Sequence, residues 1–191
     1  MNKNRTPRSK IQRVKAMMGL SVSVIIPTYN GEKSIGPLLK NIQQQSINNI
    51  EVIVIDSTST DDTRLIAAIY GAKIIDIPQS SFDHGGTRNI AAKASHGDII
   101  IMITQDVILK GENSLENLIK SFDENPKIGA VFGRQFPRSD ANSFASHLRL
   151  FNYPERSYTR SFEDKKKYGI KTAFFSDSFP ACLFQGFSSI F

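Results

Sequence analysis

The sequence has a single cysteine and no apolar run long enough to cross a membrane. Cys182 is the only cysteine among 191 residues, so no internal disulfide can form and a disulfide-stabilised framework is excluded. No segment approaches the ~18 consecutive apolar residues of a transmembrane helix. With 40% hydrophobic and 22% charged residues, the composition also excludes a disordered or collagen-like chain. It predicts one hydrophobic core of ordinary size.

The excess of positive charge is confined to the start of the chain. The formal net charge is +6, and six of the 24 basic residues lie in residues 1–15, which contain no acid. The other 18 basic residues balance 18 acidic residues, so the rest of the chain is neutral. We expect residues 1–19 to form a basic, solvated arm. Contact of this arm with a membrane surface stays open, and nucleic acid is not expected as a partner.

Five short runs rich in valine and isoleucine recur along the chain, with helical patterns between them. The runs are near-continuous rather than alternating, which is typical of strands buried on both faces of a sheet. The predicted strands are Val22–Ile26, Ile50–Ile55, Lys73–Ile77, Asp98–Ile103 and Ile128–Phe132. The predicted helices are centred on Ile35–Ile42, Leu65–Ile69, Thr87–Ser95 and Leu115–Phe122. We expect Ser34 to cap the first helix, and Asp61 and Asp62 to precede the second.

This alternation predicts an α/β fold, a Rossmann-like and mostly parallel sheet with helices on both faces. From Gly133 onward the alternation is lost, and 11 of the 13 phenylalanines lie in residues 132–191. We therefore divide the chain into the arm, an α/β half over residues 20–135, and a Phe-rich region over residues 136–191.

The loops that follow the strands are the predicted site. Right-handed crossovers place them on one edge of the sheet, where ligands of such sheets bind. These loops cover residues 27–31, 56–60, 78–88 and 104–106. They lack the Gly-x-Gly-x-x-Gly and Walker lysine motifs, which disfavours a dinucleotide cofactor or a P-loop. Their aspartates, hydroxyls and aromatic ring instead suit a nucleoside diphosphate with a hard divalent cation.

Each of these side chains also has a structural interpretation. Asp56 could cap the next helix, and Asp106 could be an ordinary loop acid. Tyr29 could serve in packing, and His84 could be a hydrogen-bonded loop histidine. Their predicted convergence on one edge favours binding.

Five segments together carry a resemblance to a known family. SVIIPTYN (23–30), EVIVIDSTSTDDT (51–63), TRN (87–89) and the stretch from Gly97 to Asp106 resemble the inverting family 2 glycosyltransferases of the GT-A fold. SFDHGGTR (81–88) and the Gln-Asp form of the metal motif are similar to rhamnosyltransferases that build bacterial surface polysaccharides.

The resemblance implies a set of site residues. Substrate contacts are expected from Pro27, Thr28, Tyr29, Asp56, Ser57, Asp83, His84, Arg88 and Gln105, and a Mg²⁺ or Mn²⁺ ion is expected on Asp106. Of these, the first three would border the nucleobase. Asp56 and Ser57 would lie at the base and ribose, with serine where many relatives have a second aspartate. Arg88 would lie near the phosphates, and Gln105 would leave the cation with one acid fewer.

The implied reaction is sugar transfer with inversion of configuration. The donor would be a nucleoside diphosphate sugar resembling dTDP-rhamnose, and the acceptor a glycan or a polyprenyl-linked glycan. Residues 20–135 would form the nucleotide-sugar-binding half and residues 136–191 a partial acceptor side. A cytoplasmic protein is expected, with peripheral contact at the inner face of the plasma membrane left open.

The general base is the point at which the sequence departs from the family pattern. Relatives place a Glu-Asp-type motif beyond the segment that resembles residues 172–179, whereas the last acid here is Asp177. The 14 residues that follow it carry no charge. The sequence therefore predicts a C-terminally truncated enzyme. Two alternatives are a short enzyme with Asp177 as base and an inactive remnant that at most binds nucleotide.

Overall fold

The computed structural model describes residues 19–124, 128–137, 139, 141–153, 155 and 182–184. Most of the basic arm, and Asp177 with most of the Phe-rich region, therefore lie outside the described residues. Within the described part, no helix is both long enough and apolar enough to span a bilayer.

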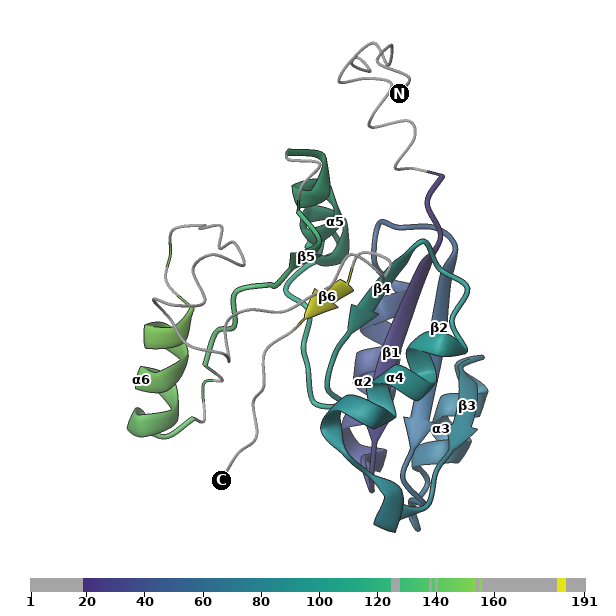
Figure 1. Cartoon of the computed structure of the whole chain (residues 1–191). Helices are drawn as coiled ribbons and strands as arrows, with labels where there is room; N and C mark the ends of the chain where they lie inside the picture. Colours follow the sequence, from purple (N-terminus) through teal and green to yellow (C-terminus); the bar gives the residue numbers. More distant parts are fainter. Residues whose placement is uncertain are drawn as a thin grey trace.

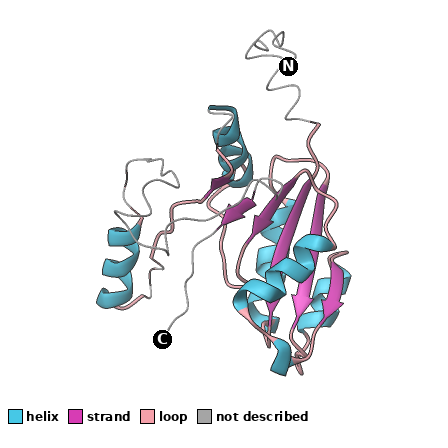
Figure 2. Cartoon of the chain, viewed as in Figure 1, coloured by secondary structure: helices cyan, strands magenta, loops and turns pink. Residues whose placement is uncertain are grey.

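Six parallel strands and the helices between them form the structure (Figures 1 and 2). The strands are β1 (Val22–Thr28), β2 (Ile50–Asp56), β3 (Lys73–Asp76), β4 (Ile99–Met102), β5 (Ala130–Val131) and β6 (Cys182–Phe184). The helices are α2 (Glu32–Gln43), α3 (Thr63–Ile69), α4 (His84–Lys93), α5 (Ser114–Glu124) and α6 (Ser143–Asn152), with a short 3-10 helix η1 (Gln79–Ser81). The strand order is β3-β2-β1-β4-β6-β5, and all adjacent strands run parallel. The predicted α/β class is confirmed.

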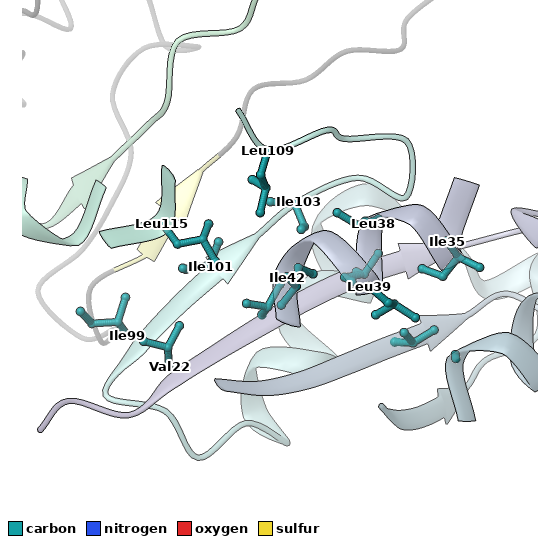
Figure 3. Packing of buried hydrophobic residues seen from close by; sticks show 14 of the residues in the cluster. Val22, Ile35, Leu38, Leu39, Ile42, Ile99, Ile101, Ile103, Leu109 and Leu115 are labelled. Atoms are coloured by element: carbon teal, nitrogen blue, oxygen red, sulfur yellow. The ribbon is translucent and has the colours of Figure 1, made fainter. Parts of the chain in front are cut away.

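The sheet buries both of its faces because successive side chains of a strand point to opposite sides. Val24 and Ile26 of β1 join a core cluster with α2 and α5, whereas Ile25 joins a second cluster with Ala91 of α4. Figure 3 shows the first cluster, in which Leu38 of α2 packs over the strands. Each fully buried isoleucine or leucine contributes roughly 1.5–3 kcal/mol relative to an exposed one. Both helix layers are thus fixed to the strands that carry the site.

The edge of the sheet departs from the predicted burial. β3 was expected to be buried on both faces, but its terminal residues Lys73 and Asp76 are exposed because β3 is the last strand of the sheet. The apolar residues Leu65, Ile66 and Ile69, which predicted α3, do not form one buried face, because only Ile66 of the three packs against the core. Leu65 and Ile69 are 60% and 73% exposed, and the helix also packs through Thr63 and Ala67.

The starts of α2 and α4 also differ from the prediction. Ser34 was expected to cap α2, but it lies in the first turn and its Oγ donates to the carbonyl of Gly31, which occupies the N-cap position. Helix α4 begins three residues before the predicted Thr87 because the Asp83 carboxylate accepts hydrogen bonds from its first backbone N–H groups. The expected position of Asp61 and Asp62 just before α3 is confirmed.

Three elements were not predicted, namely the short 3-10 helix η1, helix α6 and strand β6. Helix α6 has Phe144, Leu148 and Phe151 at positions i, i+4 and i+7, a helical spacing that the sequence already contained. Strand β6 has only three residues and gains its strand conformation by pairing with β4 and β5. A segment of three residues is too short to show a hydrophobic periodicity, so its sequence alone does not predict a strand.

The amino ends of the strands are joined through a half-buried contact between an acid and a hydroxyl. Glu51 of β2 accepts hydrogen bonds from Ser23 Oγ at 2.6 Å and from the backbone N–H of His96 at 3.0 Å. Its other oxygen lies 3.1 Å from the His96 ring. Burial opposes ionisation, but these hydrogen bonds outweigh it and lower the pKa of Glu51 to about 2. Glu51 therefore ties β1, β2 and the segment before β4 together.

This pKa predicts a pH dependence of stability. Because the pKa falls from 4.5 to about 2 on folding, the contribution of Glu51 is complete above pH 4.5 and is lost between pH 4.5 and about 2. It amounts to no more than about 3 kcal/mol. Glu51→Gln should lower the free energy of unfolding at pH 7, and the difference from wild type should vanish near pH 2 in urea unfolding followed by circular dichroism. Glu112→Gln, at an exposed position, is the control. An equal loss at both pH values would contradict the account.

Candidate functional site

Three loops meet where β1, β2 and β4 end. Thr28 at the end of β1 pairs in register with Asp56 at the end of β2. Ile25 pairs with Met102 of β4, so the chain leaves β4 beside the end of β1. The predicted convergence of these loops on one edge therefore holds, and helix α4 also starts at this edge because it follows β3 (Figure 1).

Asp56 is the buried centre of this edge. Its side chain has no exposed surface and accepts hydrogen bonds from Thr28 Oγ1 at 2.9 Å, Ser59 N at 2.8 Å and Ser59 Oγ at 2.6 Å. A buried carboxylate needs such donors to offset its lost hydration. Asp56 does not cap α3, which starts seven residues later at Thr63. It joins the end of β1 to the loop after β2.

The loops after β1 and β2 are further connected through backbone groups. Asn30 N donates to Ser59 Oγ at 2.9 Å, and Asn30 Oδ1 accepts from Thr60 N at the same distance. Gly31 N donates to Thr63 Oγ1 at 2.7 Å. Asn30, Gly31 and Thr63 are not among the predicted site residues, although the run of hydroxyls and acids over residues 57–63 is a signal for such contacts.

Two residues of these loops adopt strained backbone conformations. Asn30 has φ of 44° and Thr58 has φ of 62°. A β-branched residue such as threonine rarely adopts a positive φ, at a cost on the order of 1–3 kcal/mol. The hydrogen bond from Thr58 Oγ1 to the carbonyl of Ile77 at 2.9 Å helps to hold the conformation.

Tyr29 presents an exposed ring on a fixed backbone. Its side chain is 43% exposed, while its backbone N–H donates to Gln105 Oε1 at 3.0 Å and its carbonyl accepts from Gln105 Nε2 at 3.1 Å. The amide of Gln105 therefore connects the loop after β4 to the loop after β1. Both polar atoms of the Gln105 amide thus have protein partners.

Asp106 is the exposed carboxylate of the edge. Its Oδ1 accepts from Thr104 Oγ1 at 2.7 Å, and no hydrogen bond to Oδ2 occurs within the described residues. The described residues contain no cluster of three acids, histidines or cysteines that could enclose a metal. Mg²⁺ in nucleotide sites commonly uses one or two carboxylates together with water and substrate phosphates. Asp106 fits a cation that is shared with a phosphate-bearing substrate.

Asp83 has a structural role at the start of α4. Its carboxylate accepts hydrogen bonds from Gly85 N at 2.9 Å and Gly86 N at 3.0 Å, which lower its pKa. A Cβ on Gly86 would collide with this carboxylate, so the cap needs glycine there. His84, the first residue of the helix, lies edge-on to the Phe82 ring at 5.1 Å between centroids.

Arg88 lies one turn into α4 and is half-buried. Its Nη1 donates to the carbonyl of His84 at 2.8 Å, and burial lowers its pKa below the usual value. In the part of the chain that the structure describes, no carboxylate forms an ion pair with it. A desolvated guanidinium without a carboxylate partner is suited to binding an anion.

Ser57 and Pro27 contribute little exposed surface. Ser57 is 2% exposed, and its Oγ is buried with no hydrogen-bond partner among the described residues. Pro27 lies in β1 opposite Ile55, half-buried. The structure thus brings the predicted residues other than Asp177, which lies outside the described part of the chain, to one edge. At this edge, a buried layer around Asp56 is separate from an exposed layer with Tyr29 and Asp106.

A parallel sheet with helices on both faces and polar loops at the carboxyl ends of its strands defines a Rossmann-like α/β protein, a class in which ligands bind at this edge of the sheet. The family model for "Glycosyl transferase family 2" matches residues 23–191. The chain belongs to this family.

Two curated relatives are O-antigen chain rhamnosyltransferases. WbaN of Salmonella anatum is 44% identical over 163 residues, which cover 84% of this chain and 51% of WbaN. RfbN of Salmonella typhimurium is 44% identical over 164 residues, covering 85% of this chain and 52% of RfbN. The chain therefore spans about half the length of these relatives.

The fold is also found in solved structures of a glycosyltransferase. Residues 1–349 of TarS from Staphylococcus aureus superpose with a TM-score of 0.54 at 30% identity, covering 63% of this chain and 39% of that one. The same fragment in complex with UDP-GlcNAc gives a TM-score of 0.55 at 25% identity, covering 75% of this chain and 38% of that one. The GT-A form of the α/β fold is thereby confirmed.

Replacing the buried acid should loosen the edge. In Asp56→Asn, the amide nitrogen would face hydrogen-bond donors, so we expect a loss of about 1–3 kcal/mol in unfolding free energy. Chemical denaturation at pH 7 measures it. Asp62→Asn is the matched control because Asp62 is exposed beside α3. Equal stability of the Asp56 and Asp62 variants would show that Asp56 does not hold the loops.

Proposed function

We propose that this chain carries the nucleotide-sugar-binding half of a rhamnosyltransferase. The reaction transfers a sugar, rhamnose by the relatives' names, from a nucleoside diphosphate to a glycan or polyprenyl-linked acceptor in surface polysaccharide synthesis. Family membership and 44% identity to two O-antigen chain rhamnosyltransferases support this proposal. The single observation that carries it is the exposed edge on which Tyr29, Asp106 and Arg88 are arranged around polar loops.

The nucleoside is assigned to the loop after β1. The exposed face of Tyr29 suits stacking against a nucleobase, with Pro27 and Thr28 behind it. Asp56 and Ser57 are buried, so we assign them to supporting this surface rather than to direct contact with ribose.

The diphosphate is assigned to Arg88 and Asp106. Arg88 offers a guanidinium with no carboxylate partner among the described residues, and Asp106 offers an exposed carboxylate oxygen to Mg²⁺ or Mn²⁺. When bound, the divalent cation neutralises negative charge on the departing diphosphate. Arg88 would stabilise the same charge from the side of α4.

The remaining steps concern the sugar and its acceptor. The proposed reaction inverts the anomeric centre, because the acceptor hydroxyl attacks from the face opposite the leaving diphosphate. A carboxylate must accept the hydroxyl proton, and Asp177, the sequence candidate, lies outside the described residues. His84 is assigned beside the donor sugar. Asp83, assigned there by the resemblance, positions His84 by capping its helix.

The acceptor side is assigned to the residues after β5. There the Phe136 ring lies 4.6 Å from the Arg134 guanidinium carbon and 4.9 Å from Lys110 Nζ. Arg134 is also paired with Glu155 at 3.6 Å, whereas Lys110 forms no ion pair among the described residues. The Lys110 ammonium therefore suits an anionic acceptor, such as the phosphate of a polyprenyl-linked glycan. Such an acceptor would place the protein at the cytoplasmic face of the plasma membrane.

Removing the cation ligand should abolish metal-dependent binding. Wild type should bind thymidine diphosphate more tightly with Mg²⁺ or Mn²⁺ than in EDTA, and Asp106→Ala should remove this difference because no second acid replaces Asp106 in the described part of the site. Isothermal titration calorimetry measures both affinities. Glu112→Ala, an exposed acid outside the site, should behave as wild type. A metal dependence that survives in Asp106→Ala would overturn the assignment.

Arg88 should act on phosphate and not on the nucleoside. Arg88→Gln should weaken thymidine diphosphate binding by roughly tenfold, the value of one charge-assisted hydrogen bond, and leave thymidine binding unchanged. Arg64→Gln, which removes only an exposed ion pair with Asp76, is the control. Equal loss for nucleoside and diphosphate would contradict the phosphate assignment.

Turnover separates an active enzyme from a nucleotide-binding remnant. Radiolabelled dTDP-rhamnose and a polyprenyl-linked acceptor are incubated with the chain, and transfer is followed in the lipid fraction. Rhamnose transfer supports the enzyme. Diphosphate binding without transfer supports the remnant.

A further inference from the structure

One primary amide pairs with both backbone groups of a single residue at the site edge. Gln105 Oε1 accepts from Tyr29 N at 3.0 Å, and Gln105 Nε2 donates to the Tyr29 carbonyl at 3.1 Å. The two bonds span 76 positions in sequence and connect the loops after β1 and β4. The orientation of the amide follows from its partners, because an N–H needs an acceptor and a carbonyl needs a donor.

An acid could not make both contacts. An ionised carboxylate only accepts hydrogen bonds, so glutamate at position 105 would keep the bond from Tyr29 N but direct an oxygen at the Tyr29 carbonyl. It would also add a negative charge next to Asp106. Glutamine at position 105 therefore makes a neutral two-point contact that glutamate could not make.

Gly31 provides an independent sign that the contact is built into the site. A Cβ at position 31 would lie 2.5 Å from Gln105 Oε1 and 2.7 Å from its Cδ, so any larger residue would displace the amide. The backbone at Gly31 is held in place by the bond from its N–H to Thr63 Oγ1. The space for the amide therefore depends on glycine.

We propose that Gln105 is a positioning residue that fixes the Tyr29 backbone, and so the placement of the Tyr29 ring, independently of any bound cation. Its amide is committed to the protein and does not serve as a metal or sugar ligand. The functional meaning rests on the proposed nucleotide site, in which the nucleoside part of the donor would bind to a surface that is already ordered before metal arrives.

Amide hydrogen exchange tests the contact itself and needs no ligand. In NMR exchange measurements, the Tyr29 amide should exchange at different rates in Gln105→Ala and Gln105→Glu. Loss of the whole contact should raise the Tyr29 exchange rate by about five- to tenfold, while Gln105→Glu should raise it less because its carboxylate still accepts from Tyr29 N. The Asn30 amide, which donates to Ser59 Oγ, is the internal control and should keep its rate. An unchanged Tyr29 rate in Gln105→Ala would overturn the proposal, and a parallel rise at Asn30 would show general loosening and overturn it as well.

Nucleotide affinity in EDTA tests the consequence. Gln105→Ala and Gly31→Ala should each weaken thymidine diphosphate binding about five- to tenfold, and the double variant should be no weaker than either single variant because all remove one contact. Gln43→Glu on the exposed surface of α2 is the control. If Gln105 were a cation ligand, its replacement would weaken binding only with metal, and Gly31→Ala would have a separate, additive effect. That pattern would overturn the proposal.

Absence of any nucleotide binding by wild type would instead refute the proposed function. The hydrogen-exchange rate of the Tyr29 amide would still decide whether Gln105 holds the Tyr29 backbone.

Discussion

The buried carboxylate of Asp56 is the interaction on which the site edge depends. It lies at the end of a central strand with no exposed surface, and its three donors come from β1 and from its own loop. Because leaving such a group without donors is costly, the two loops must stay together in the folded state. The positive φ values of Asn30 and Thr58 are tolerated for the same reason, since the surrounding hydrogen bonds over-determine them.

This arrangement divides the charged groups of the edge by role. Asp56 and Asp83 are used within the protein, one joining loops and the other capping α4. The Asp106 carboxylate is exposed and the Arg88 guanidinium is half-buried, so one negative and one positive group are available to a ligand. A diphosphate with a cation complements both, because the cation meets the carboxylate and the phosphate oxygens meet the guanidinium. The edge therefore has a densely hydrogen-bonded part around Asp56, to which we assign the nucleoside, and a charged part at Asp106 and Arg88, to which we assign the diphosphate.

The predicted strands and helices are confirmed where burial of an apolar face decides the conformation. The continuous apolar runs of β1, β2 and β4, and the helical spacing of α2 and α5, follow from their need for a covered face. The convergence of the loops follows from parallel topology. Burial of β3 could not be predicted, because its position at the sheet edge depends on strand order rather than on its own residues. The hydrogen-bond partners of individual polar side chains could not be predicted either. Nothing in the local sequence shows that Gln105 would reach the Tyr29 backbone or that Asp83 would face Gly86.

We propose that the carboxyl edge of β1, β2 and β4 receives the nucleoside diphosphate part of the donor. The most direct measurement is NMR mapping of backbone amides during titration with thymidine diphosphate and Mg²⁺. The account predicts saturable shifts in residues 28–31, 57–60 and 104–106, with the amino edge around Ser21, Glu51 and Asp98 unaffected. Shifts confined to the amino edge, or none at millimolar nucleotide, would contradict it.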